Sequence, residues 1–72
     1  MFGKNLRKAR KKRNLTLINA ALTLNTTHAT LSRYENEKLE PNIEMLKQMC
    51  LLYNVSADYL IGLPENMPFP KA

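Results

Sequence analysis

Hydrophobic residues in this chain recur every three or four positions, which is the spacing of one face of a helix. Residues 4–13 contain no glycine, proline or β-branched residue, and Leu6 and Ala9 share one face. Residues 43–53 carry the longest apolar stripe, formed by Ile43, Leu46, Met49, Cys50 and Tyr53. No alternating stretch is long enough for a β-strand. The pattern therefore predicts an all-α fold of five short helices.

Short polar residues separate these helices. The predicted helices cover residues 4–13, 17–24, 28–36, 43–53 and 57–61. Ser, Thr and Asn favour the position before a helix, because the side-chain oxygen accepts a backbone N–H of the first turn. Such residues precede four of the five helices, at Thr16, Thr27, Asn42 and Ser56. Asn14, Asn25 and Gly62 tolerate the left-handed backbone that ends a helix. Residues 63–72 contain three prolines and are predicted to be extended or disordered.

Positive charge is concentrated in the first half of the chain. The whole chain has a net charge of +5. Residues 1–34 hold eight Lys or Arg and no acid, whereas residues 35–72 hold three Lys and six acids. This asymmetry favours a polyanionic partner, either nucleic acid or an acidic surface.

One of these cations is predicted to face the core. At about 100° per residue, Arg10 falls beside the face that carries Leu6 and Ala9. A buried cation is costly unless an acid meets it. Because Glu35 is the only acid in the first 35 residues, we expect Arg10 and Glu35 to form a structural ion pair.

Residues 17–36 have the spacing of a helix-turn-helix motif. Ala21 is small enough for two helices to cross closely, and Asn25 follows four residues later at the turn. Leu31 then fills the space between the helices, and Tyr34 continues its stripe. This spacing holds the second helix of the motif out from the body of a domain.

With these features the chain resembles the Cro and phage-repressor type (XRE-like, lambda-repressor-like) helix-turn-helix family. The resemblance covers residues 6–62. It is carried by Leu6-Arg7-x-x-Arg10, Leu15-Thr16, Ala21-x-x-Leu24, Thr27-x-x-x-Leu31-Ser32-Arg33-Tyr34-Glu35-Asn36, Lys38, Pro41 and Val55-Ser56-x-Asp58-Tyr59-Leu60-Ile61-Gly62. The chain departs from the usual family pattern at three positions, with Leu17 in place of Gln, and Asn25 and Glu37 each in place of Gly.

The resemblance implies a compact five-helix DNA-binding domain over residues 6–62, with the motif at 17–36 and an extended tail at 63–72. In the family, the second helix of the motif enters the major groove. The base-reading positions that this implies are His28, Ala29, Ser32 and Arg33. The implied phosphate contacts are Thr16, Leu17, Thr27, Asn36 and Lys38. Arg33 suits guanine because its guanidinium matches O6 and N7.

The residue inventory argues against an enzyme. The single His and single Cys give no metal cluster, and neither a nucleophile–base signature nor a glycine-rich phosphate loop is present. We therefore expect no cofactor and no bound metal. One cysteine excludes a disulfide framework and fits a reducing compartment. With no apolar run of membrane-spanning length and no signal-like start, we expect a cytoplasmic protein that does not bind membranes.

Two functional classes remain. The first is a sequence-specific transcriptional regulator, a repressor of phage or mobile-element type, that binds a palindromic DNA operator as a homodimer. The second is a protein-binding adaptor or antirepressor that keeps the fold but binds DNA weakly. Several apolar residues outside the expected core favour a protein partner, namely Leu17, Leu22, Leu39 and Leu51. For the dimer contact we expect Tyr59, Leu60, Leu63, Met67 and Phe69; alternatively, the tail is a linker from a longer repressor.

Overall fold

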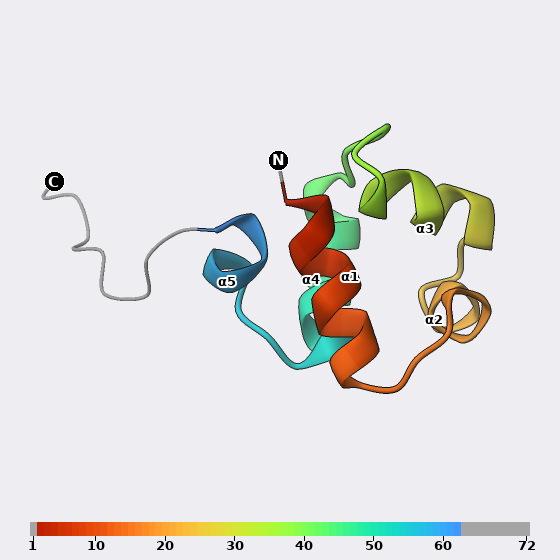
Figure 1. The fold of residues 1–72 in the computed structure, drawn as a ribbon, viewed down its shortest axis with the longest axis horizontal. Coiled ribbons are helices and arrows are strands. Elements are labelled where there is room, and N and C mark those ends of the chain that lie inside the picture. Colours follow the sequence, from red (N-terminus) through yellow and green to blue (C-terminus); the bar gives the residue numbers. More distant parts are fainter. Residues whose placement is uncertain (1, 63–72) are drawn as a thin grey trace, which may run out of the picture.

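The computed structural model describes residues 2–62, and within this range the chain forms five helices and no strand (Figure 1). The helices are α1 (Gly3–Lys12), α2 (Leu17–Thr23), α3 (His28–Glu35), α4 (Ile43–Tyr53) and α5 (Ala57–Ile61). The all-α prediction is thus confirmed, and α4 and α5 have the predicted bounds. The segment 63–72, for which we predicted an extended or disordered tail, lies outside the described residues.

Local side-chain chemistry sets where the helices begin. The side chains of Thr16, Thr27, Asn42 and Ser56 each accept a hydrogen bond from a backbone N–H in the first turn of the helix that follows. These four bonds satisfy N–H groups that have no partner inside the helix. The predicted caps are therefore confirmed.

Residues with a left-handed backbone conformation lie at the ends of helices and in the turns between them. Asn14, Asn25, Asn54 and Gly62 all have positive φ, as expected for residues that end helices. Glu37, which directly follows the C-cap of α3, also has a positive φ of 62°. This conformation places Cβ close to the following carbonyl oxygen, so it is unfavourable for a long side chain.

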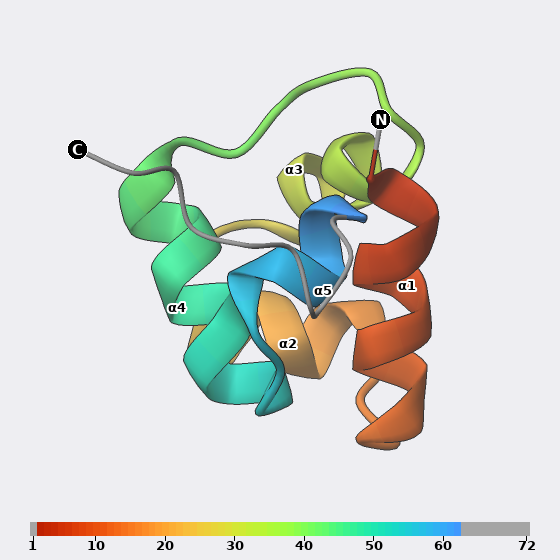
Figure 2. The ribbon, with the colours of Figure 1, turned by 90° about the vertical axis from the view of Figure 1, so that its left-hand side faces the viewer.

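All five helices contribute to one hydrophobic core. Its buried members are Leu6, Ala9, Ala20, Ala21, Leu24, Leu31, Met49, Tyr53 and Leu60. α1 crosses in front of α4, with α2 and α3 on one side and α5 on the other (Figure 1). The view turned by 90° shows α5 in front of α1 and α4, with α2 and α3 behind them (Figure 2). The helix-turn-helix motif and α5 therefore lie on opposite sides of the domain.

Two expectations about side-chain placement are wrong. Leu60, expected at a dimer contact, is 0 % exposed, because it is the residue through which the short α5 packs into the core. Ile43, expected in the apolar stripe of residues 43–53, is 86 % exposed. At about 100° per residue, Ile43 lies about 120° around α4 from the buried Met49. It is therefore turned away from the core.

Within residues 2–62, no helix is long and apolar enough to cross a membrane.

Candidate nucleic-acid interface

The inner face of α3 is fixed in the core. Leu31 is fully buried, Glu35 is buried, and Tyr34 is half-buried against the core. The opposite face of this eight-residue helix meets solvent. Because Leu31 and Glu35 hold the inner side of α3 in the core, the outward residues of α3 have a fixed orientation.

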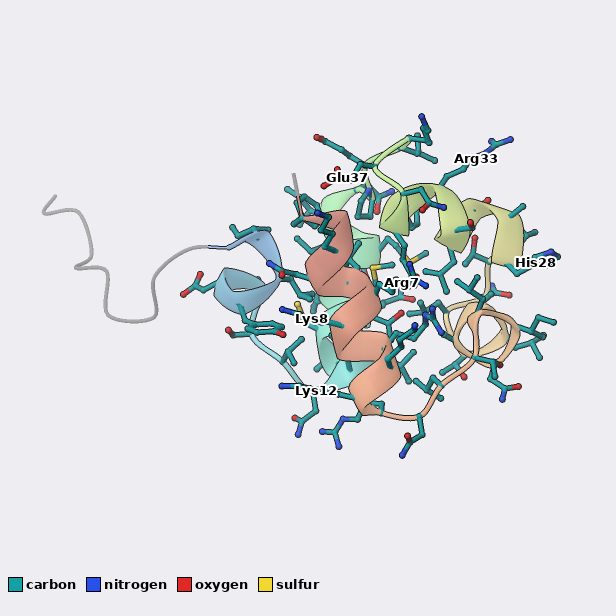
Figure 3. The ribbon with its side chains drawn as sticks, in the orientation of Figure 1. Arg7, Lys8, Lys12, His28, Arg33 and Glu37 are labelled. Atoms are coloured by element: carbon teal, nitrogen blue, oxygen red, sulfur yellow. The ribbon has the colours of Figure 1, made fainter. Side chains whose placement is uncertain are left out.

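The four residues expected to read bases lie together on the outward side of α3. His28, Ala29 and Arg33 are exposed, and Ser32 is half-buried. His28, in the first turn, and Arg33, in the second, both project away from the rest of the domain (Figure 3). The structure thus brings these side chains onto one accessible helix face.

The two threonines expected at phosphates have local partners. Oγ1 of Thr16 accepts a hydrogen bond from the backbone N of Asn19 at 3.1 Å. Oγ1 of Thr27 accepts one from the backbone N of Thr30 at 3.1 Å and lies 2.9 Å from Oγ1 of Thr30. Both hydroxyls are exposed. They cap α2 and α3 and are accessible from the solvent.

The C-terminal end of α3 carries a second pair of polar groups. Nδ2 of Asn36 donates a hydrogen bond to Oγ of Ser32 at 3.1 Å. Lys38 is exposed, and its backbone N donates to the carbonyl oxygen of Arg33 at 2.9 Å. These bonds place Asn36 and Lys38 at the C-terminal end of α3, and their predicted phosphate contacts stay a prediction. Leu17 differs from them because it is half-buried and packs against the core.

The predicted ion pair between α1 and α3 is present. Nε of Arg10 donates to Oε2 of Glu35 at 2.7 Å, and Nη2 donates to Oε1 at 3.1 Å. Nη1 of Arg10 donates to the carbonyl oxygen of Leu15 at 2.7 Å. The hydrogen bond to Glu35 raises the pKa of Arg10 above its usual value. Because both side chains are buried, this pair ties the motif to α1.

Most of the positive charge has no acidic partner. Among residues 2–62, the Arg10–Glu35 pair is the only ion pair. The other cations of α1 therefore keep their charge available to an external anion, and so does Arg33. Figure 3 shows Arg7 on the side of α1 toward α2 and α3, whereas Lys8 and Lys12 lie on the other side.

Sequence reasoning missed several long-range contacts to α1. Nδ2 of Asn5 donates to the carbonyl oxygens of Tyr59 and Leu60, at 3.3 and 3.2 Å, which ties α5 to α1. Nε of Arg13 donates to the carbonyl oxygen of Tyr53 at 3.0 Å. Arg13 had a weak signal, since it falls beside the apolar face of α1, but Asn5 had none.

The metal-ligating residue types and the single cysteine are dispersed or packed in the described part of the chain. No group of three or more His, Cys, Asp or Glu side chains within residues 2–62 is placed to hold a metal ion. Burial raises the pKa of the Cys50 thiol, which disfavours the thiolate needed of a nucleophile. Cys50 is half-buried and packs against the core, so it acts as a small apolar residue.

The sequence of this chain is similar to a known protein family and to several named proteins. The helix-turn-helix family matches residues 6–60. The HTH-type transcriptional regulator ImmR of Bacillus subtilis is 43 % identical over 64 residues, which are 89 % of this chain and 50 % of ImmR. The HTH-type transcriptional regulator YobD of the same organism is 34 % identical over 71 residues, 99 % of this chain and 62 % of YobD.

A relative named for a different role is the antitoxin PezA of Streptococcus pneumoniae. It is 34 % identical over 62 residues, which are 86 % of this chain and 39 % of PezA. The chain thus spans between about two fifths and three fifths of the length of these relatives. On the family match and the five-helix structure, the chain belongs to the Cro and phage-repressor type, XRE-like helix-turn-helix family.

Proposed function

We propose that the chain is a sequence-specific DNA-binding transcriptional regulator whose α3 reads the major groove. The observation that carries this proposal is the outward face of α3, where exposed polar side chains stand on a helix held from behind by Leu31 and Glu35. An α-helix fits the width of the major groove, and a fixed support gives its side chains a defined register.

Each outward residue of α3 has a role suited to its chemistry. Arg33 binds guanine through O6 and N7, and the methyl group of Ala29 contacts a thymine methyl. His28 and Ser32, on the same outward face, offer hydrogen bonds to neighbouring base edges. Phosphates on the flanking backbone are contacted by Thr16, Leu17 (through its backbone), Thr27, Asn36 and Lys38.

The basic first half of the chain supports the same function. Cations on α1 without an acidic partner in the described structure attract the DNA at long range. They add affinity for any sequence, whereas α3 adds discrimination.

A homodimer on a palindromic operator completes the proposal. One short helix reads only a few base pairs, which gives too little specificity in a genome. Two-fold symmetry doubles the site and places the half-sites about 34 Å apart. On the side away from α3, the half-buried Tyr59 remains a candidate contact, together with Leu63, Met67 and Phe69, which lie outside the described residues.

The named relatives support a regulator and also a second candidate. ImmR and YobD carry the name HTH-type transcriptional regulator, which favours a transcriptional regulator for this chain. The more specific proposal, a repressor of phage or mobile-element type, rests on the resemblance to the Cro and phage-repressor family. PezA is named an antitoxin. A protein-binding adaptor is favoured by one observation, namely that Ile18 and Leu22 on α2 are 60 % and 72 % exposed.

Selection of bound duplexes from a random DNA pool tests the proposal. The selected duplex and a scrambled duplex of the same composition are then titrated at about 50 and 200 mM salt, and we expect the selected one to bind at least about 10³-fold more tightly. Equal affinity for the two duplexes would favour the adaptor. Sedimentation with a palindromic and a half-site duplex counts the bound chains, and one chain on the palindrome would contradict the dimer.

A further inference from the structure

A small depression lies where α1, the beginning of α2 and the C-terminal half of α3 meet. Its volume is about 160 Å³. It is lined by Arg7, Arg10, Leu17, Ser32, Glu35 and Asn36. Three of these residues belong to α3 or its C-cap, so the depression adjoins the face proposed to read bases.

Of the charged residues that line this depression, one cation has no ion-pair partner among residues 2–62. Arg10 uses Nε and Nη2 on Glu35 and Nη1 on the carbonyl oxygen of Leu15. The carboxylate of Glu35 is neutralised by the same pair. Arg7 is exposed and, among residues 2–62, has no ion-pair partner. The depression therefore has a net positive charge that is carried by Arg7.

The geometry of α1 separates Arg7 from its basic neighbours. At about 100° per residue, Arg7 lies about 60° around the helix from Arg10, which points to α3. Lys8 and Lys12 each lie about 160° from Arg10, on the far side of the helix. Figure 3 shows the same division, with Arg7 toward the motif and the two lysines away from it.

A second donor, at the C-cap of α3, lines the same depression. One N–H of the Asn36 amide is held by Oγ of Ser32 at 3.1 Å, which fixes the orientation of the amide and leaves its other N–H free to donate. A depression lined by a guanidinium and an oriented amide N–H, with the nearby carboxylate already paired, suits an anionic oxygen. Arg in particular matches phosphate oxygens with two parallel hydrogen bonds.

We propose that Arg7 and Asn36 together bind one backbone phosphate of the DNA that α3 reads. This inference rests on the proposed function and adds α1 to the DNA interface. Asn36 lies three residues after Arg33, the last of the residues proposed to read bases. The phosphate is therefore expected to belong to the duplex that α3 reads. A phosphate bound there fixes the distance between the DNA backbone and α3.

The test compares three charge-matched variants, Arg7→Gln, Lys8→Gln and Lys12→Gln. All three positions are exposed, so a thermal unfolding curve for each is expected to match that of the unaltered chain. Affinity for the selected duplex is measured over a salt series. For Arg7→Gln we expect the slope of log K against log salt to fall by about 0.9, the value for one lost phosphate contact. For the two lysine variants we expect less than half of that change.

Further outcomes decide the proposal. Arg7→Lys is expected to keep most of the slope while binding less tightly, because one ammonium replaces a two-point contact. Base preference is expected to stay the same in Arg7→Gln, since a phosphate contact carries no sequence information. Equal slopes for Arg7→Gln and Lys8→Gln would overturn the proposal but leave the proposed function intact. An unaltered chain that binds no duplex would overturn the proposed function itself.

Discussion

Nε of Arg10 lies 2.7 Å from Oε2 of Glu35, and the two buried side chains join α1 to α3 through two hydrogen bonds. The remaining guanidinium nitrogen, Nη1, binds the carbonyl oxygen of Leu15 just before α2. One side chain therefore fixes α1, the entrance to the motif and α3 relative to one another. The position of the outward face of α3 depends on this arrangement.

Glu35→Gln is expected to destabilise the fold strongly. The substitution keeps the shape of the side chain but leaves the buried Arg10 without a counter-charge. Removing one partner of a buried pair costs about 3–5 kcal/mol. Chemical denaturation measures the free energy of unfolding, and a loss below about 1 kcal/mol would mean that the pair behaves as an exposed one.

A double variant provides the control for this prediction. Arg10→Met combined with Glu35→Leu removes both charges and keeps apolar volume. It is expected to be more stable than Glu35→Gln alone, since no charge remains buried without a partner. A double variant that is less stable than the single one would place the stabilisation in the hydrogen bonds rather than in the charge balance.

Gly3→Ala is expected to destabilise the fold, although alanine favours a helix more than glycine does. Gly3 is buried where the beginning of α1 meets the end of α3. A Cβ at this position would overlap the carbonyl oxygen of Glu35 and lie 2.8 Å from that of Tyr34. Backbone atoms cannot move aside cheaply, so we expect a loss of about 1–3 kcal/mol. Lys4→Ala, at the next and exposed position, serves as the control and should change stability little.

Glu37→Gly is expected to stabilise the fold. Glu37 has a φ of 62°, a conformation that costs a residue with a Cβ roughly 1–2 kcal/mol and glycine nothing. Part of this gain is offset by the greater freedom of glycine in the unfolded chain, which leaves about 1 kcal/mol. Glu37→Ala removes the same charge but keeps Cβ. If both variants had the same free energy of unfolding, the effect would come from charge and not from the backbone.

The positions of the helices were predictable because the signals that begin and end them lie within a few residues of each other in the sequence. Thr16, Thr27, Asn42 and Ser56 each bond to a backbone N–H three residues away, so a few consecutive residues contain the whole signal. The outward face of α3 was equally accessible, since it follows from the helical period once Leu31 is placed inside.

Contacts between distant segments were predictable only where chemistry forced them. Arg10 and Glu35 could be paired because a cation near the core needs an acid and one acid was in reach. Asn5, which binds carbonyl oxygens of α5, carries no such requirement. The burial of Leu60 and the close approach at Gly3 likewise depend on how the helices pack, which the local pattern does not contain.

Arg33→Ala is expected to remove sequence discrimination at one base position. Loss of a two-point contact to guanine costs about 1–3 kcal/mol on the preferred duplex and little on a scrambled one. Arg33 is exposed, so stability should be unaffected. Lys12→Ala, also exposed but on the far side of α1, is the control. Equal weakening on both duplexes would make Arg33 a phosphate contact and place the base reading elsewhere on α3.

Tyr53→Phe is expected to make the fold more resistant to alkaline pH. The ring of Tyr53 is buried, and its Oη has no hydrogen-bond partner among residues 2–62, so the variant loses no such bond. Burial, and next the nearby Glu35 carboxylate, raise the pKa of Tyr53 to about 12 from the usual 10. Between these values the unfolded chain has lost the phenol proton and the folded chain retains it. The unfolded state thus binds fewer protons, and stability falls as the pH rises through this window.

Because one pKa unit corresponds to about 1 kcal/mol, the unaltered chain should lose up to about 2 kcal/mol more than Tyr53→Phe between pH 10 and 12. Denaturation of both proteins across this range measures the difference, in which lysine titration cancels. Parallel curves would show that the phenol ionises in the folded chain as readily as in the unfolded one.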